Sequence, residues 1–216
     1  MKKYNTVKPV KWLVFALVLV CSFYVPMSSK TTKASGVARV GYANGFNEQF
    51  TTSASNWFIV SGKWTYGSGV FRGNAVASDT SSVFFKQAEY ANFDFQVKMR
   101  RKGCSGCDNS LSVRNCCARS LNFHYDNLQR YSIIAETGIG YKTIQPSTKS
   151  TAIISGGFNV LRVVAIGNAY EFYVNNKLLK KFTYFGQSSG HVGIEFFAWE
   201  TKGNYIEVDY AILKTK

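Results

Sequence analysis

The fold is decided by residues 158–214, which read FNVLRVVAIGNAYEFYVNNKLLKKFTYFGQSSGHVGIEFFAWETKGNYIEVDYAILK. β-Branched and aromatic residues fill the apolar runs of this segment. Turn residues stand in the breaks between the runs, at Gly167-Asn168, Asn175-Asn176, Gly190 and Gly203-Asn204. Short strands with turn residues at this spacing are typical of antiparallel sandwiches, and no stretch has the apolar period of a helix. The segment therefore predicts four or five antiparallel strands and an all-β fold.

The N-terminus has the layout of a secretory signal peptide. Basic residues come first, at Lys2, Lys3, Lys8 and Lys11, and an apolar run covers Trp12–Met27. Small residues in Thr32–Ala34 offer a cleavage site. The apolar run is shorter than the about 20 residues that a membrane helix needs, although an uncleaved anchor stays an alternative. We expect a signal peptide at 1–34, a short polar lead-in at 35–43 and one domain at 44–216, in a secreted (extracellular or periplasmic) protein.

The charge of the chain falls once the signal peptide is removed. The full sequence has 26 lysines and arginines against 12 acidic residues, a formal net charge of +14. Residues 1–34 hold six lysines and no acidic residue, so the remainder carries +8. This charge favours an anionic polysaccharide, a cell wall or a membrane surface as the partner. The sequence lacks the dense stripe of basic residues that is typical of a nucleic-acid binder. Membrane contact is expected only through an uncleaved anchor.

Four cysteines remain after the signal peptide: Cys104, Cys107, Cys116 and Cys117. An even number in an exported protein favours two disulfides, for example Cys104–Cys117 with Cys107–Cys116 stapling a hairpin loop. The sequence leaves three connectivities open. A zinc site with four thiolates and a pair of redox-active cysteines are the alternatives, although adjacent ligands suit tetrahedral zinc poorly.

Framework motifs resemble a known superfamily. The segments Phe46–Phe50, Trp57–Trp64 and Gly69–Gly73 read F-x-x-x-F, W-x-x-x-x-G-x-W and a glycine followed by apolar residues. With the closing strands, they resemble the concanavalin A-like lectin/glucanase superfamily, which includes laminin G-like domains, family-16 glycoside hydrolases and 3-keto-disaccharide hydrolase-type domains. The resemblance spans residues 44–214 and implies a two-sheet antiparallel jelly-roll β-sandwich with carbohydrate as a ligand class.

The catalytic motif of the family-16 enzymes has no counterpart in the carboxylate spacing. Those enzymes carry E-x-D-x-x-E or E-x-D-x-E on one strand, because retaining hydrolysis needs two carboxyls about 5 Å apart. Only Glu207 and Asp209 have i, i+2 spacing, and they lie in the closing strand. We therefore expect a non-catalytic lectin-like module. A protein-binding adhesion module and a glycosidase or lyase with another carboxylate arrangement are the alternatives.

The closing strand Tyr205–Leu213 also suggests a metal. It resembles a strand of the family-16 group whose aspartate commonly helps to hold a structural calcium ion. This implies a calcium site at Asp209, with Glu48 as a neighbour, because calcium takes many oxygen ligands from carbonyls and water. The alternative is an aspartate that accepts backbone N–H groups.

Strand parity gives the candidate binding face. In the segment from His191 to Trp199, Val192, Ile194 and their alternates form an apolar face, and Glu195 lies on the opposite face. Sugar rings stack on aromatic side chains, while sugar hydroxyls bond to planar polar groups. The predicted ligand-binding residues are Arg114, His124, Tyr131, Glu195 and Trp199.

Overall fold

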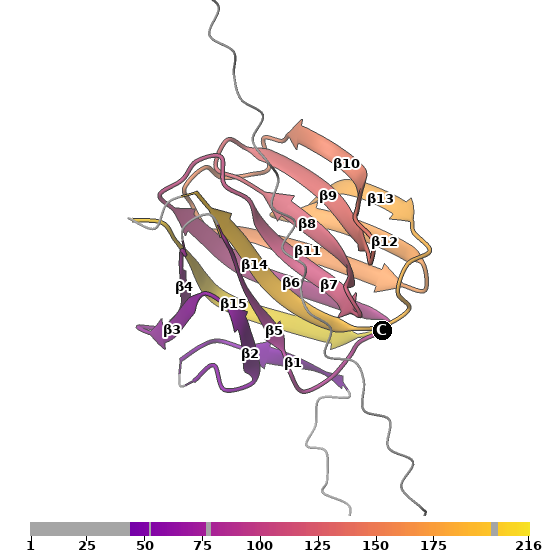
Figure 1. Cartoon of the computed structure of the whole chain (residues 1–216), viewed down its shortest axis with the longest axis horizontal. Helices are drawn as coiled ribbons and strands as arrows, with labels where there is room; N and C mark the ends of the chain where they lie inside the picture. Colours follow the sequence, from indigo (N-terminus) through magenta and orange to yellow (C-terminus); the bar gives the residue numbers. More distant parts are fainter. Residues whose placement is uncertain (1–43, 52, 77–78, 200–202) are drawn as a thin grey trace, which may run out of the picture. The chain divides into compact units, whose positions relative to one another are not determined.

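The computed structural model describes residues 44–51, 53–76, 79–199 and 203–216. The predicted signal peptide and the whole polar lead-in lie outside the described residues. The described part forms two antiparallel sheets that pack face to face (Figure 1). None of its helical residues makes a segment long and apolar enough to cross a membrane. The predicted all-β, two-sheet jelly-roll sandwich is confirmed.

One sheet has eight strands, all paired antiparallel. In spatial order they are β13 (Lys177–Thr183), β12 (Ala169–Val174), β11 (Asn159–Ile166), β6 (Phe93–Lys102), β15 (Tyr205–Thr215), β4 (Val70–Asn74) and β3 (Lys63–Gly67). The remaining strand, β1 (Gly45–Glu48), pairs with the second half of β15, beyond the part that pairs with β4.

The other sheet has seven strands and carries the candidate site. In spatial order they are β10 (Tyr141–Lys149), β9 (Arg130–Thr137), β8 (Arg119–Tyr125), β7 (Asn109–Cys116), β14 (His191–Ala198), β5 (Asp79–Phe85) and β2 (Trp57–Ser61). The segment that decided the fold from sequence supplies the five strands β11 to β15. The predicted turn Asn175-Asn176 joins β12 to β13 with both φ angles positive, at 49° and 66°, as a type I′ hairpin requires.

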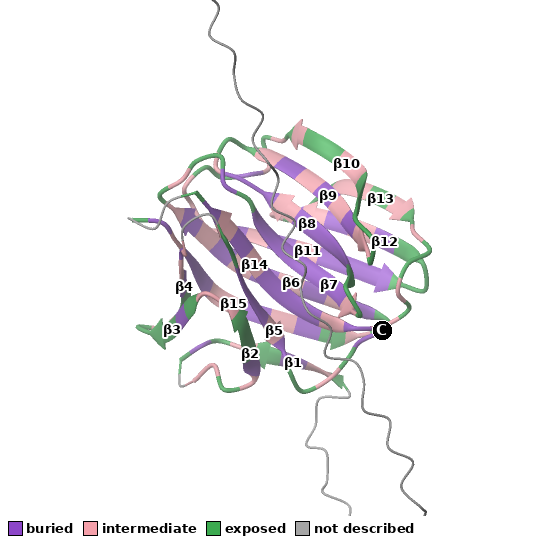
Figure 2. Cartoon of the chain, in the orientation of Figure 1, coloured by how far each residue is buried: buried purple, intermediate pink, exposed green. Residues whose placement is uncertain are grey.

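The core lies between the sheets and follows the alternation of the strands (Figure 2). Along β6, Phe93, Phe95, Val97 and Met99 are fully buried. The same alternation carries Arg101 into the interior, where it lies over the ring of Phe196. Burial lowers the pKa of Arg101 to about 10. Its Nε and Nη2 atoms have no hydrogen-bond partner within the described residues, so a costly cation sits in the core.

Arg114 is also buried, but all its donors are used. Its guanidinium donates to the carbonyl oxygens of Ala91 (2.6 Å), Gly167 (2.7 Å) and Gln187 (3.0 Å) and to the Tyr170 hydroxyl (2.6 Å). Arg114 thus ties the loops before β6, β12 and β14 to the end of β7. Its pKa is lowered by burial, against the opposing effect of the Tyr170 hydroxyl.

The cysteines differ from the expected pairing. Cys104 bonds to Cys107, with Cα atoms 5.5 Å apart, while Cys116 and Cys117 are free thiols. The Cys104–Cys117 and Cys107–Cys116 example was therefore wrong. The cysteines do not share one loop, because β7 begins after Cys107 and ends at Cys116. A strand of that length spans roughly 25 Å, far beyond the reach of a disulfide.

Candidate functional site

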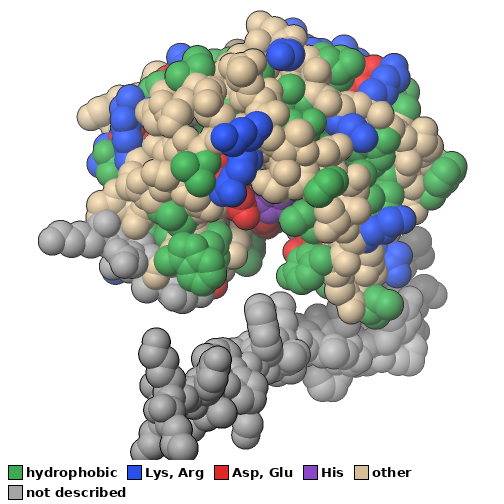
Figure 3. Space-filling model, turned by 90° about the horizontal axis from the view of Figure 1, so that it is seen from above, with side chains coloured by type: hydrophobic (Ala, Val, Ile, Leu, Met, Phe, Trp, Pro, Cys, Tyr) green, Lys and Arg blue, Asp and Glu red, His purple; other side chains and the backbone are tan. Residues whose placement is uncertain are grey.

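The outward face of the seven-stranded sheet holds an open groove with a volume of about 650 Å³. The residues that line it come from β5, β7, β8, β9, β10 and β14, together with Asp108, which precedes β7. They are Thr80, Asp108, Ser110, Asn122, His124, Ile134, Glu136, Tyr141, Thr143, Glu195, Phe196 and Phe197. Figure 3 shows the hollow, with acidic and histidine side chains inside it.

The registers of the strands build a transverse row of polar residues across the floor. Glu195 on β14 lies opposite Ser82 on β5 and Ser110 on β7. Ser110 lies opposite His124 on β8, which in turn faces Ser132 on β9. Residues opposite each other in an antiparallel pair point to the same side of the sheet. The three serines are short, so Glu195 and His124 stand as the larger groups of the row.

A second row of paired residues lies two residues further along the strands. Gly193 on β14 pairs with Ser112 on β7, and Ser112 pairs with Asn122 on β8. A Cβ atom on Gly193 would lie 2.3 Å from the ring of Phe84, so only glycine lets that ring cover the floor at this point. Small residues at the middle of both rows keep the floor low between larger flanking side chains, which is the origin of the groove.

Glu195 is the most perturbed acid of the groove. Burial raises its pKa to about 7, and the negative charge of Glu136 adds to the effect. Glu136 lines the same groove and accepts a hydrogen bond from the Ser120 hydroxyl at 2.7 Å. In the described part of the chain, Glu195 forms no ion pair with a lysine or arginine. At neutral pH this carboxyl can therefore donate a proton as well as accept one.

Two polar groups of the floor lack partners. Asn122 is 4% exposed, and its Oδ1 accepts no hydrogen bond from any described residue. The His124 Nδ1 is likewise buried and without a partner in the described structure. Burial lowers the pKa of His124, and the nearby Asp108 carboxylate opposes this effect. Buried polar atoms are satisfied in most proteins, so a water or ligand is expected to complete these two.

Aromatic side chains lie at the groove and beside it. Phe197 and Tyr141 line it, and Tyr141 is 77% exposed. Trp199, just after the end of β14, packs edge-on against Phe197 with ring centroids 4.7 Å apart. Trp199 itself is 66% exposed. These rings offer apolar surfaces next to the polar floor.

The structure brings together three of the five predicted ligand-binding residues. Glu195 and His124 line the groove, and Trp199 contacts its wall through Phe197. Arg114 does not line the groove, because an irregularity in β7 with a φ of 50° at Arg114 breaks the alternation and turns the side chain inward. Tyr131 has core parity on β9, where it is 8% exposed and donates to the Leu179 carbonyl.

The predicted metal residues lie outside the groove. Asp209 forms an ion pair with Lys98 at 2.7 Å, and Glu48 accepts a hydrogen bond from Asn56 at 2.8 Å. Among the described residues no three His, Cys, Asp or Glu side chains form a group that could hold a metal ion. Calcium binding at Asp209 stays a prediction.

Sequence reasoning did not select several groove residues. Asp108, Glu136, Tyr141, Thr143 and Phe197 were not among the candidates, although each lines the groove. Parity on β9 could have found one of them, since Ile133 and Ala135 are buried in the core and Glu136 is on the other face. Asp108 precedes its strand and Tyr141 begins an exposed one, so alternation gives no signal for them.

Solved structures with a similar fold include carbohydrate-active proteins. The carbohydrate-binding module CBM66 from Bacillus subtilis has a TM-score of 0.59 at 15% identity, over 72% of this chain and 94% of that one. The Bacillus licheniformis β-glucanase has a TM-score of 0.62 at 12% identity, over 82% of this chain and all of that one. A β-1,3-1,4-glucanase (lichenase) from a mouse hindgut metagenome has a TM-score of 0.65 at 11% identity, over 80% and 100%.

Comparison of the sequence itself gives no relative: no protein-family model matches it, and neither does any curated protein. Identities of 15% and below carry the fold and do not distinguish a binding module from an enzyme. The chain therefore has the fold of the concanavalin A-like jelly-roll β-sandwiches.

Proposed function

We propose that the chain is an exported, lectin-like module that binds a polysaccharide in the groove of its seven-stranded sheet. The observation that carries the proposal is the groove floor, where Asn122 and His124 hold buried polar atoms that have no partner among the described residues. Sugar hydroxyls both donate and accept hydrogen bonds, so they match such a floor. The fold is shared with a carbohydrate-binding module and with glucanases, which supports this ligand class.

The charge of the groove favours a neutral polysaccharide. Among the described residues, its lining includes the acids Asp108, Glu136 and Glu195 and contains neither lysine nor arginine. An anionic chain would meet repulsion on this floor, whatever the net positive charge of the whole protein. The anionic partner considered from composition is therefore not part of the proposal.

The aromatic side chains would provide the apolar contacts to the sugar rings. Tyr141 and Phe197 line the groove, and Trp199 extends the apolar surface beside Phe197. A pyranose ring has an apolar face that stacks on such rings, while its hydroxyls reach the polar floor. Glu195 and His124 would bond the hydroxyls of one sugar unit, because they lie in one row with only Ser110 between them.

Binding is tested by isothermal titration of the full chain with a neutral glucan such as laminarin and with alginate as the anionic polymer. Asn122→Ala should weaken glucan binding about tenfold, since a ligand hydrogen bond contributes about 1 to 1.5 kcal/mol. The matched control is Gln96→Ala on β6, which lies in the other sheet opposite Arg162 and Ile212 and should leave binding unchanged. Absence of binding to neutral glycans across an array, or binding only to anionic ones, would overturn the proposal.

One observation favours a second candidate, a glycoside hydrolase or lyase. Glu195 has a pKa of about 7 and shares the groove with Glu136. A protonated carboxyl beside a second carboxylate is the pair that glycoside hydrolysis uses for acid and base catalysis. In this candidate Glu195 would donate a proton to the leaving-group oxygen, and Glu136 or Asp108 would act as base or nucleophile.

The two candidates are separated by measuring new reducing ends after incubation with neutral polysaccharides. A hydrolase should lose activity in Glu195→Gln, and its rate should fall as the pH rises through about 7, because Glu195 then loses its proton. Glucan binding without any release of reducing ends or unsaturated products, in the wild-type chain, would leave the binding module as the function and exclude hydrolase and lyase activity on the polymers tested.

A further inference from the structure

The turn between β7 and β8 carries two adjacent free thiols. Cys116 is the last residue of β7, Cys117 follows it in the turn, and Arg119 begins β8. The two sulfur atoms lie 2.8 Å apart, closer than two unbonded sulfurs normally approach. Cys117 is exposed and Cys116 is half-buried. Neither can pair with the other cysteines of the domain, because Cys104 and Cys107 are bonded to each other.

We propose that Cys116 and Cys117 form a reversible vicinal disulfide, a redox site separate from the Cys104–Cys107 bond. The conformation of the turn places the two thiols next to each other. Cys117 and Ala118 have φ angles of 55° and 58°, which are the left-handed values of a type I′ hairpin turn. Such values are unfavourable for residues other than glycine or asparagine, and this turn holds them while it keeps both sulfurs on one side.

The bond would be easier to reduce than the existing disulfide. Adjacent Cα atoms are 3.8 Å apart across a trans peptide, whereas disulfides normally need at least about 4.4 Å. The ring that includes the Cys116–Cys117 peptide is therefore strained. The Cα atoms of Cys104 and Cys107 are 5.5 Å apart, within the usual range. Strained and exposed disulfides are the labile ones, so the two bonds should respond to different reducing conditions.

The oxidant we infer is a small disulfide such as oxidised glutathione. The exposed Cys117 thiolate attacks one glutathione sulfur, the glutathione S–S bond breaks, and one reduced glutathione leaves. Cys116 then attacks the Cys117 sulfur and expels the second glutathione. The protein loses two protons and two electrons, and the oxidant gains them. Cys117 attacks first, because the hydrogen bond to Cys117 and burial raise the pKa of Cys116 and keep Cys116 protonated. In the second step Cys116 releases its proton to water and attacks as the thiolate.

The positions of Arg114 and Arg119 allow a direct test by peptide mapping. Trypsin releases residues 115–119 with both Cys116 and Cys117, and residues 103–114 with both Cys104 and Cys107. The full chain is incubated with oxidised glutathione, alkylated, digested without reduction and analysed by mass spectrometry. We expect peptide 115–119 unalkylated and lighter than the dithiol by two hydrogen atoms. Stepwise addition of dithiothreitol should expose Cys116 and Cys117 to alkylation before Cys104 and Cys107.

Two variants keep the test decisive. Cys117→Ser should leave Cys116 alkylated or carrying one glutathione, and Cys104→Ser with Cys107→Ser should leave the vicinal bond intact. The proposal is overturned if peptide 115–119 stays fully alkylated after oxidation. It is equally overturned if that peptide is found linked to 103–114 or to a second copy of itself, or if both pairs open at the same dithiothreitol concentration.

Discussion

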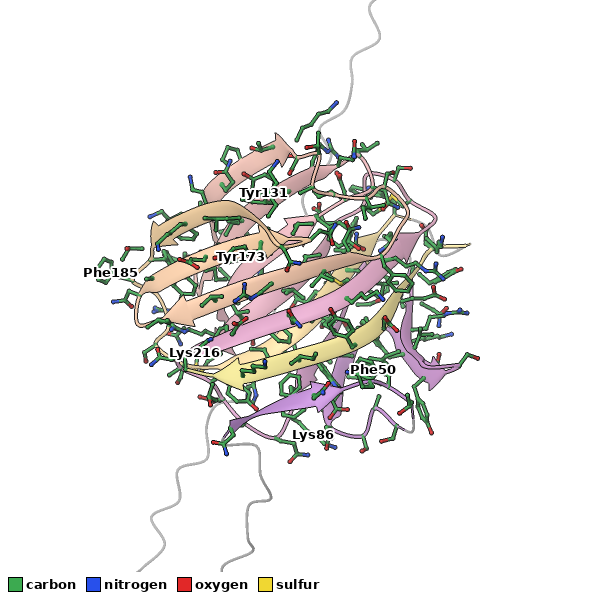
Figure 4. The ribbon with its side chains drawn as sticks, turned by 180° about the vertical axis from the view of Figure 1, so that it is seen from behind. Phe50, Lys86, Tyr131, Tyr173, Phe185 and Lys216 are labelled. Carbon is green, nitrogen blue, oxygen red and sulfur yellow. A yellow bond between two sulfur atoms is a disulfide. The ribbon has the colours of Figure 1, made fainter. Side chains whose placement is uncertain are left out.

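The two outward faces of the sandwich both carry polar side chains, yet one face satisfies them and the other does not. On the eight-stranded sheet, Glu207 accepts from Arg72 at 2.5 Å and from Arg100 at 2.6 Å. Asp94 binds Arg162 through both carboxylate oxygens, at 2.6 and 2.7 Å. Figure 4 looks onto this face, with Tyr173 on β12 and Lys216 at the chain end labelled.

The described lining of the groove lacks such arginine–carboxylate pairs. In the described part of the chain, the acids of the groove meet no lysine or arginine in the lining, and Asn122 and His124 keep polar atoms without partners. Burial also raises the pKa of Glu195. On the opposite sheet, the pKa of Glu207 falls below its usual value, since the bonds and charges of Arg100 and Arg72 outweigh the effect of burial. A satisfied face needs nothing further, whereas an unsatisfied one gains free energy from a ligand.

The largest expected effect concerns Arg114, which the sequence assigned to the groove and the structure assigns to the interior. Arg114→Met should lower the free energy of unfolding by about 3 to 5 kcal/mol, because three carbonyls and a tyrosine hydroxyl lose their donor. Urea denaturation measures the loss. Glucan affinity of the folded variant in the cold should be unchanged, and a selective loss of affinity with normal stability would return Arg114 to the groove.

The next effect is the pH dependence that Glu195 gives to stability. Its pKa is about 7 in the folded chain against 4.5 in an ordinary environment, so between these values the folded state holds a proton that the unfolded state has released. Stability therefore falls as pH rises from about 4.5 to 7, by up to about 3 kcal/mol. Glu195→Gln removes this loss. The variant should be more stable than wild type at pH 8 and nearly equal at pH 4 in urea denaturation, and equal gains at both pH values would contradict the assignment.

On the eight-stranded sheet, removing a carboxylate should change the stability in the opposite direction. Glu207→Gln removes a charge that is 4% exposed and bonded to two arginines, so we expect a loss of about 2 kcal/mol at pH 7. Because the folded pKa is lowered, the contribution of Glu207 is present above about pH 4.5 and is lost as the pH falls through the folded value. The difference between variant and wild type should therefore shrink below about pH 4. A variant that gained stability at pH 7 would erase the contrast between the faces.

The fold could be predicted because core parity is a local property. The apolar alternates Val192, Ile194, Phe196 and Ala198 are all buried in the structure, as their spacing indicates. The same parity placed Glu195 on the outward face, where it lines the groove. Wherever a strand is regular, the alternation of residues was sufficient to assign each side chain to the core or to the outward face.

The position of Arg114, the polar row of the groove and the pairing of the cysteines could not be predicted, because they depend on features that no single regular strand contains. The irregularity at Arg114 reverses its side, and the clamp that it forms joins loops from three distant parts of the chain. The row that joins Glu195 to His124 exists only through strand pairing, since β14 and β8 lie far apart in sequence. Similarly, the cysteine pairs are separated by β7, which a count of cysteines does not reveal.

The smallest effect is expected at Asp209, and it bears on the calcium prediction. Its ion pair with Lys98 is exposed, with both side chains 37% accessible, so Asp209→Asn should change stability by less than about 0.5 kcal/mol. Thermal unfolding of wild type and variant, each with calcium and with EDTA, measures this. If Asp209 only pairs with Lys98, the four melting temperatures will be nearly equal. A wild-type chain that loses several degrees in EDTA, when the variant does not, would mean that the carboxylate exchanges Lys98 for a calcium ion, and the satisfied face would then also hold a ligand site.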